Sequence, residues 1–328
     1  MWQEWYQSAL ARREAMTWWQ GGALDAAGLA RAIGMAGPLA DARQWRAFVR
    51  HVCAWLAAVL LAAAAVCAVA ANWDALDKAS RLTGAQAVLV VVTLTAMLPG
   101  LSALLRTLAL LLACLLLGAL LALVGQTYQS GADPWQLFAA WAGLMLPWVL
   151  AARSAVLWLV WAAVLNVALL LWMPWLGDVT AGALAVFALA NLFLLGAWEA
   201  AWRRFAWLGG HAGPRLLASW LTAVLGGHAV LASIDAGDAP ADWHVIGWWA
   251  GAAMAIAMFY RYVRRDLAML ALVLSSAIAV VTAQCAARIG ELDDGGGAAL
   301  FAMLALVVLA QAALAAGWLR RLARSQAQ

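Results

Sequence analysis

Charged residues are scarce in this chain. Only 11% of its 328 residues are Asp, Glu, Lys or Arg, while 67% are hydrophobic. A soluble globular domain carries about 25% charged residues, so the composition excludes an ordinary soluble protein. The formal net charge is only +4. The distribution of the basic residues along the chain indicates a membrane topology rather than a nucleic-acid interface. We therefore expect no nucleic-acid partner.

Motifs of known chemistry are also missing. The chain has no GxSxG, no HExxH, no P-loop and no pair of aspartates within an apolar segment. Its four cysteines include no CxxC pair and lie in or beside apolar segments, where single cysteines usually serve packing. Acid–base, metal or phosphate chemistry needs convergent reactive groups. The sequence therefore predicts no enzyme, no metal centre and no cofactor.

Long apolar runs fill most of the chain. Ten segments rich in Ala, Leu and Val have no charge near their middle, and about 20 such residues let a helix cross a bilayer. β-Barrel strands would be shorter and would alternate with polar residues. We predict an all-α fold, a polytopic integral membrane bundle of about ten transmembrane helices. The predicted spans are residues 51–71, 85–104, 107–124, 135–152, 154–173, 179–200, 215–234, 243–260, 267–287 and 298–319.

The basic residues alternate between the connections of these spans. Seventeen of the 20 lysines and arginines fall in the N-terminal region, in every second connection and in the C-terminal tail. The other connections hold only Lys78, Arg81 and Arg288. Because positive residues in short loops stay in the cytoplasm, this alternation predicts that both termini are cytoplasmic.

The predicted organisation has three regions. Residues 1–50 form a small cytoplasmic helical region, residues 51–319 the ten-helix transmembrane bundle, and residues 320–328 a basic cytoplasmic tail. In the first region we expect one helix that ends at Gly21-Gly22 and a second from Ala23 to Ile33. Such a short region is expected to lie on the membrane surface or to dock a partner.

A weak internal similarity relates two parts of the bundle, about residues 106–173 and 215–287. It is either a parallel repeat or a coincidence in a chain rich in tryptophan and alanine. At a shift of 108 residues, Gly118, Trp135, Trp141, Ala142, Gly143 and Arg153 correspond to Gly226, Trp243, Trp249, Ala250, Gly251 and Arg261.

Uncharged polar side chains concentrate in residues 125–135, at the outer end of the third predicted span. The candidate site residues of this outer polar cluster are Gln126, Tyr128, Gln129, Asp133 and Trp135. Amides, a phenol and an indole suit a sugar, a polyol or a lipid headgroup. A structural interpretation fits equally: one helix ends here, and Asp133 with the proline after it begins the next helix as cap and first residue.

Polar side chains inside the predicted spans are few. The candidate intramembrane residues are Asn166, Asn191 and His228, which either hydrogen-bond between helices or line a solute path. Glu199, near the end of the sixth span, precedes Arg203 by one helical turn, so we expect an ion pair between them. No carboxylate lies near the middle of a span, where coupled transporters hold a proton or an ion.

Several strings of the first half resemble a bacterial family of predicted membrane proteins, domain-of-unknown-function family 2157. The resemblance covers about residues 15–175 and implies a location in the bacterial inner membrane, but no activity, ligand or catalytic residue. The strings are WWQGG at 18–22, AANWD at 70–74, GQTYQ at 125–129, GADPW at 131–135 and LF at 137–138, followed by Trp141 and Leu146-Pro147.

Two functions remain open from the sequence. The first is a structural, regulatory or accessory membrane protein without catalysis, which the missing buried charges favour. The second is a transporter or channel for a neutral or lipid-like solute, which the length, the internal similarity and the prolines within spans favour. The lipid bilayer is the expected partner in both cases, and a membrane-protein partner or a second copy of the chain is compatible with either.

Overall fold

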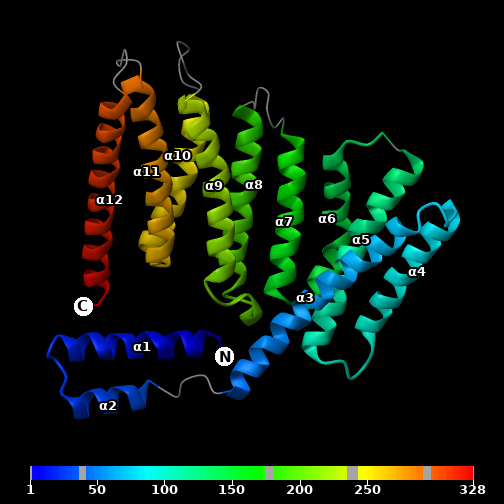
Figure 1. Ribbon diagram of the computed structural model, residues 1–328, viewed down its shortest axis with the longest axis horizontal. Coiled ribbons are helices and arrows are strands. Elements are labelled where there is room, and N and C mark those ends of the chain that lie inside the picture. Colours follow the sequence, from blue (N-terminus) through cyan, green and yellow to red (C-terminus); the bar gives the residue numbers. More distant parts are fainter. Residues whose placement is uncertain are drawn as a thin grey trace. The chain divides into compact units, whose positions relative to one another are not determined.

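The computed structural model of the protein describes residues 2–36, 42–129, 131–173, 181–234, 243–290 and 297–327. These residues form twelve α-helices, a short 3₁₀-helix and a π-helical segment (Figure 1). The helices are α1 (Trp2–Gln20), α2 (Ala26–Met35), α3 (Ala42–Ala71), α4 (Lys78–Met97), α5 (Ala103–Tyr128), α6 (Pro134–Ala152), α7 (Ala155–Trp172), α8 (Ala181–Ala201), η1 (Ala206–Leu208), α9 (Ala212–Ile234), α10 (Trp243–Met258), η2 (Phe259–Val263), α11 (Leu267–Gly290) and α12 (Gly297–Ala327).

The prediction of an all-helical membrane protein is confirmed. In the described residues, nine helices are long and apolar enough to cross a membrane: α3, α4, α5, α6, α7, α8, α9, α11 and α12. The remaining predicted span, residues 243–260, forms α10, which has 16 residues and continues without a break into η2. The two predicted N-terminal helices are present as α1 and α2, the second with Asp25 as its cap.

Several predicted spans begin or end elsewhere, and α12 continues to Ala327, through most of the predicted tail. Helix α3 has 30 residues and begins nine residues before the predicted span. Helix α4 begins at Lys78, where the Asp77 side chain accepts a hydrogen bond from the Ser80 N–H, and it ends at Met97. The predicted end at residue 104 is wrong because the chain leaves the helix before Pro99, which cannot donate to a helical carbonyl, and Gly100 then takes a positive φ of 84°.

The chain divides into two compact units. Unit 1 contains Met1–Gly131 and Met145–Ala152, and unit 2 contains Ala132–Leu144 and Arg153–Gln328. In unit 1, α5 packs on both α3 and α4, and α1 packs on α2. Half of the most apolar window of α5 is buried, against 11% for α3 and 6% for α4. Helix α5 is therefore the central helix of unit 1.

In unit 2, α9 is the central helix and packs on α8, α10 and α11, while α12 packs on the outside of α11 (Figure 1). Two glycines of α9 permit this close packing. A Cβ on Gly213 would lie 2.3 Å from the Trp198 ring of α8, and a Cβ on Gly226 would lie 2.8 Å from Ser276 Oγ of α11. The Ser276 hydroxyl also accepts a hydrogen bond of 2.9 Å from Trp249 Nε1 of α10.

Candidate functional site

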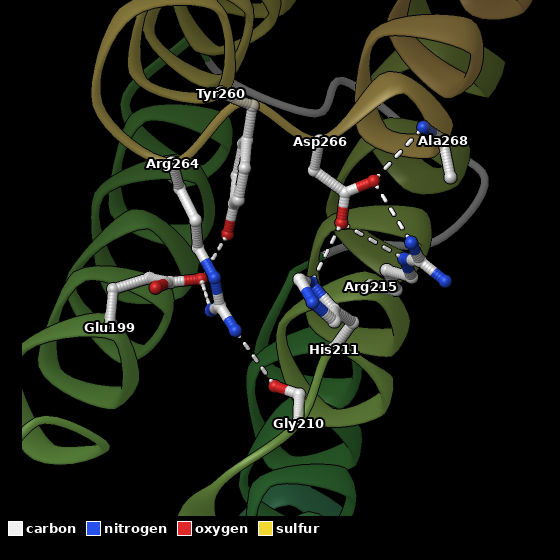
Figure 2. A network of polar contacts seen from close by, with 8 residues as sticks. All are labelled: Glu199, Gly210, His211, Arg215, Tyr260, Arg264, Asp266 and Ala268. Atoms are coloured by element: carbon white, nitrogen blue, oxygen red, sulfur yellow. Dashed lines mark hydrogen bonds and ion pairs between the residues drawn. The ribbon is translucent and has the colours of Figure 1, made fainter. Parts of the chain in front are cut away.

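A network of charged and polar side chains joins four helices at the arginine-bearing end of unit 2. We call it the polar network (Figure 2). Its residues come from α8, from the η1–α9 connection, from α9, from η2 and from the start of α11. They are Glu199, Gly210, His211, Arg215, Tyr260, Arg264, Asp266 and Ala268.

The first half of the polar network is centred on Glu199, whose side chain is 4% exposed. Its Oε1 accepts a hydrogen bond from the Tyr260 hydroxyl and another from the Arg264 guanidinium, each with a donor–acceptor distance of 2.5 Å. Arg264 also donates to the Gly210 carbonyl over 2.9 Å and lies over the ring of Trp202. An ion pair with Arg264 therefore links α8 to η2, and the predicted pair with Arg203 is wrong.

The second half is centred on Asp266, which is also 4% exposed in its side chain. Arg215 of α9 donates to both carboxylate oxygens over 3.0 Å, and His211 Nδ1 lies 3.1 Å from Oδ2. The Ala268 N–H donates to Oδ1 over 3.0 Å, so Asp266 also caps α11. Burial by itself would raise the pKa of Asp266, but the hydrogen bonds and charge of Arg215 outweigh burial and hold this pKa below its ordinary value.

The segment η2 turns the chain so that the two halves lie side by side. It is a π-helical stretch, a form found mostly as a single turn within or at the end of an α-helix. Arg265, which follows it, has a φ of 48°, in the left-handed region that non-glycine residues rarely adopt. As a result, Tyr260 and Arg264 contact Glu199 on one side of the turn, and Asp266 contacts Arg215 on the other (Figure 2).

A cavity of about 280 Å³ lies beside Glu199, between α8 and α10. Its walls are mostly apolar, and Glu199 and Arg203 are its charged residues. The second carboxylate oxygen of Glu199, Oε2, is buried and has no hydrogen-bond partner among the described residues. Glu199, which lines the cavity, thus has one carboxylate oxygen with two hydrogen-bond donors and one buried oxygen without a partner.

Two of the predicted intramembrane residues meet each other. Asn191 Nδ2 of α8 donates to Asn166 Oδ1 of α7 over 2.8 Å, and the same oxygen accepts from Trp220 Nε1 of α9 over 2.9 Å. Asn166 is 3% exposed and Asn191 is 1% exposed. Each Nδ2 also donates to a carbonyl of its own helix. The amide cluster of Asn166, Asn191 and Trp220 therefore connects α7, α8 and α9, as interhelical hydrogen bonding predicts.

His228 makes no hydrogen bond to the amide cluster. It lines a cavity of about 250 Å³ between α7 and α9, together with Trp220 and otherwise apolar residues. Its side chain is half-buried and makes no hydrogen bond to another described residue. Of the two roles open for His228, the interhelical hydrogen bond has no partner among the described residues.

The residues of the outer polar cluster divide between the two units. Gln126 and Tyr128 are exposed at the end of α5, and Gln129 caps α5 with a left-handed φ of 45°, so the two amides do not share a continued helical face. Asp133 is the cap position of α6, but its side chain makes no capping hydrogen bond, and Trp135 is half-buried. The first three residues belong to unit 1 and the last two to unit 2.

The sequence did not predict the polar network. By sequence, Tyr260 only ends the predicted span 243–260, Asp266 lies in the connection after it, and Arg215 and Arg264 belong to the arginine-bearing connections. The available signal was the presence of two acidic residues, Glu199 and Asp266, at helix ends otherwise rich in arginine. Within the described residues, no group of three or more His, Cys, Asp or Glu side chains is placed to hold a metal ion.

Comparison with known proteins gives one match, to a family model that covers part of the chain. No curated protein and no solved structure matches the chain. The matched segment runs from α1 to the first residues of α7 and contains the strings at 18–22 and 125–129. Together with the nine long apolar helices, it makes the chain a multi-pass membrane protein of unknown function, and residues 16–158 match the family of predicted membrane proteins DUF2157.

Proposed function

We propose that the protein is a non-catalytic accessory protein of the bacterial inner membrane, with both termini in the cytoplasm. The sorting of arginines supports the orientation, and the family match supports a membrane protein. An accessory protein here means one that supports or regulates another membrane component and converts no substrate. Its function then depends on its helical surfaces and on a stable bundle.

The amide cluster is the observation that carries this proposal. Two asparagines that are 3% and 1% exposed hydrogen-bond to each other, to Trp220 and to their own helices, and among the described residues only Asn191 Oδ1 of these amides has no partner. Polar groups that bind a passing solute must be left available to it, since a hydrogen bond to a neighbouring helix competes with the solute. The buried carboxylates Glu199 and Asp266 are likewise paired with arginines. These groups therefore hold helices together.

A second candidate function is transport of a small neutral or lipid-like solute. The observation that favours it is the cavity at His228, which has a half-buried imidazole and lies next to Trp220 of the amide cluster. A polar group in an otherwise apolar pocket inside a membrane helix is a common feature of solute sites.

Reconstitution in liposomes separates the two candidates. The purified protein is placed in vesicles, and the entry of glycerol, urea and erythritol is followed by light scattering after a concentration jump. An accessory protein leaves the entry rates equal to those of protein-free vesicles. Faster entry that is lost in the His228→Phe variant would instead establish transport through the His228 cavity and overturn the accessory function.

A further inference from the structure

The cavity beside Glu199 opens at the surface of unit 2. Several residues that line it are exposed, among them Gly196 and Ala200 on α8, Arg203 in the turn after α8, and Ala255 on α10. A Cβ on Gly196 would meet nothing within 4 Å, so this wall of the cavity has open space. The position between two apolar helices makes the cavity accessible to lipids.

The residues that line the cavity change from apolar to charged along α8 and the turn after it. Leu192, Leu195 and Gly196 come first and are apolar; Glu199 follows near the helix end, and Arg203 lies beyond it. With a rise of about 1.5 Å per residue, the apolar part extends roughly 10 Å from the carboxylate into the span. A ligand that fits this order has an apolar chain, then a hydrogen-bond donor, then an anionic group.

The unpartnered carboxylate oxygen of Glu199 calls for a hydrogen-bond donor on the ligand. Tyr260 and Arg264 both bond to Oε1, whereas Oε2 is buried without a partner. A buried acceptor without a partner is unfavourable, and a hydroxyl hydrogen bond removes that cost. Oε2 is closed to solvent, although Glu199 is one of the residues that line the cavity. Binding of a donor at Oε2 therefore requires the carboxylate to turn about its terminal torsion, which is broad in glutamate.

The anionic group is required by the charges. The Glu199 carboxylate is neutralised by Arg264, which leaves Arg203 as the unneutralised charge among the residues that line the cavity. Arginine is well suited to phosphate because its planar guanidinium can donate two parallel hydrogen bonds. Basic pockets between membrane helices are established sites for lipid headgroups.

We propose that this cavity binds a monoacyl glycerophospholipid, with the acyl chain along α8 and α10. The free glycerol hydroxyl donates to Glu199 Oε2 and the phosphate pairs with Arg203. A diacyl phospholipid fits less well, because at the level of Glu199 it carries only ester oxygens, which are acceptors and would face the carboxylate. This site goes beyond the accessory function, and either can be wrong without the other.

Binding of 1-oleoyl-glycerol-3-phosphate to the full-length protein in nanodiscs tests the site. Two comparison lipids are the analogue without the glycerol hydroxyl, 1-oleoyl-propanediol-3-phosphate, and dioleoyl phosphatidic acid. We expect saturable binding of the first lipid, and at least about tenfold weaker binding of the other two, as loss of a hydrogen bond to a charged group implies. Equal binding of the analogue without the hydroxyl would overturn the role of Glu199, and absence of saturable binding would overturn the site.

Two pairs of variants locate the binding. Arg203→Gln removes the phosphate partner, and Arg204→Gln removes a neighbouring exposed arginine that does not line the cavity. Gly196→Leu fills the cavity, and Ala197→Leu adds the same side chain at an exposed position outside it. We expect at least about tenfold loss of affinity in Arg203→Gln and Gly196→Leu and less than about twofold change in the two controls. If the members of a pair have equal affinities, the lipid binds elsewhere and the proposal fails; because Arg203 is exposed, this test holds even if Gly196→Leu does not fold.

Discussion

The Tyr260 hydroxyl lies 2.5 Å from Oε1 of Glu199, although the two residues are 61 positions apart in the sequence. Tyr260 is 1% exposed and Glu199 is 4% exposed. The contact therefore joins α8 to η2 through a buried hydrogen bond, which Arg264 supplements with its charge. A buried carboxylate that lost these partners would keep its charge without compensation.

Removal of the Arg264 charge is expected to destabilise the protein strongly. The Arg264→Met variant leaves Glu199 unpaired, a loss that typically costs about 3–5 kcal/mol. The double variant Glu199→Gln/Arg264→Met removes both charges and is expected to recover most of the stability. Thermal unfolding of the detergent-solubilised protein, followed by size-exclusion chromatography, measures both effects.

Arg204→Gln provides the matched control for this cycle, because Arg204 is exposed and lies outside the polar network. Its thermal stability is expected to match that of the wild type. A double variant that is no more stable than Arg264→Met would show that the two residues act independently, against the structure.

The ends of the spans and the pairing of their side chains differ in how far the sequence predicts them. The apolar runs define α7 to α9 and α11 within a few residues, because the hydrophobicity of a span is a local property. The polar first turn of α4, with Lys78 and Arg81, resembles a loop by hydropathy, but the Asp77 cap makes it helical. Arg81 itself donates to the Leu76 carbonyl and lies over the Trp73 ring.

Long-range pairs could not be predicted in the same way. The expected partner of Glu199 was Arg203, one turn away, yet its partner is Arg264, 65 positions along the chain. That choice depends on how α8 packs on α10 and on the π-helical turn of η2, and neither leaves a local pattern in the sequence. The sequence predicts that buried amides within spans hydrogen-bond between helices, but it does not predict that Asn166 pairs with Asn191.

Acid is expected to weaken the contribution of Asp266. Its pKa lies below the ordinary value of 3.8 in the folded protein, so the stability that it contributes is present above about pH 4 and is lost as the pH falls through the lowered pKa. Thermal unfolding temperatures of the wild type and of Asp266→Asn should therefore differ clearly at pH 6 and converge towards pH 2. A difference that stays constant or widens in acid would contradict this prediction. Because the His211 ring also faces Asp266, the comparison is repeated in a His211→Gln background.

A methyl group at position 213 is expected to disturb the contact of α8 with α9. In Gly213→Ala the new Cβ would lie within 2.3–2.9 Å of three atoms of the Trp198 ring, so the helices must move apart or the indole must turn. Such overpacking typically costs about 1–3 kcal/mol. Gly227→Ala, on the same helix, is the control, because a Cβ there meets nothing within 4 Å. Thermal unfolding should show a lower midpoint for Gly213→Ala and an unchanged or higher one for Gly227→Ala; equal decreases would refute the packing argument.

The amide cluster is expected to contribute measurably to the packing of α7, α8 and α9. Asn166→Leu removes the oxygen that accepts from both Asn191 and Trp220, and hydrogen bonds between membrane helices are worth about 0.6–2 kcal/mol each. The Trp220→Phe variant removes one of the two donors and should cost less. A double-mutant cycle of Asn166→Leu with Trp220→Phe, measured by thermal unfolding, gives the coupling between them, and a coupling of zero would mean that the bond does not stabilise the bundle.

Fusions to alkaline phosphatase test the orientation of the chain, because this enzyme is active only outside the cytoplasm. The arginine-poor connections are expected on the outer side, so a fusion after Gln129 should be active. Fusions after Gly100, Arg153 and Arg204, in or beside arginine-bearing connections, should be inactive, as should one after Arg324 in the C-terminal tail. Activity after Arg324 together with inactivity after Gln129 would reverse the orientation. Activity at both positions would instead require an even number of crossings between them, which would contradict ten spans and favour an α10 that does not cross the membrane, since α10 is the predicted span that is not among the nine long apolar helices of the described residues.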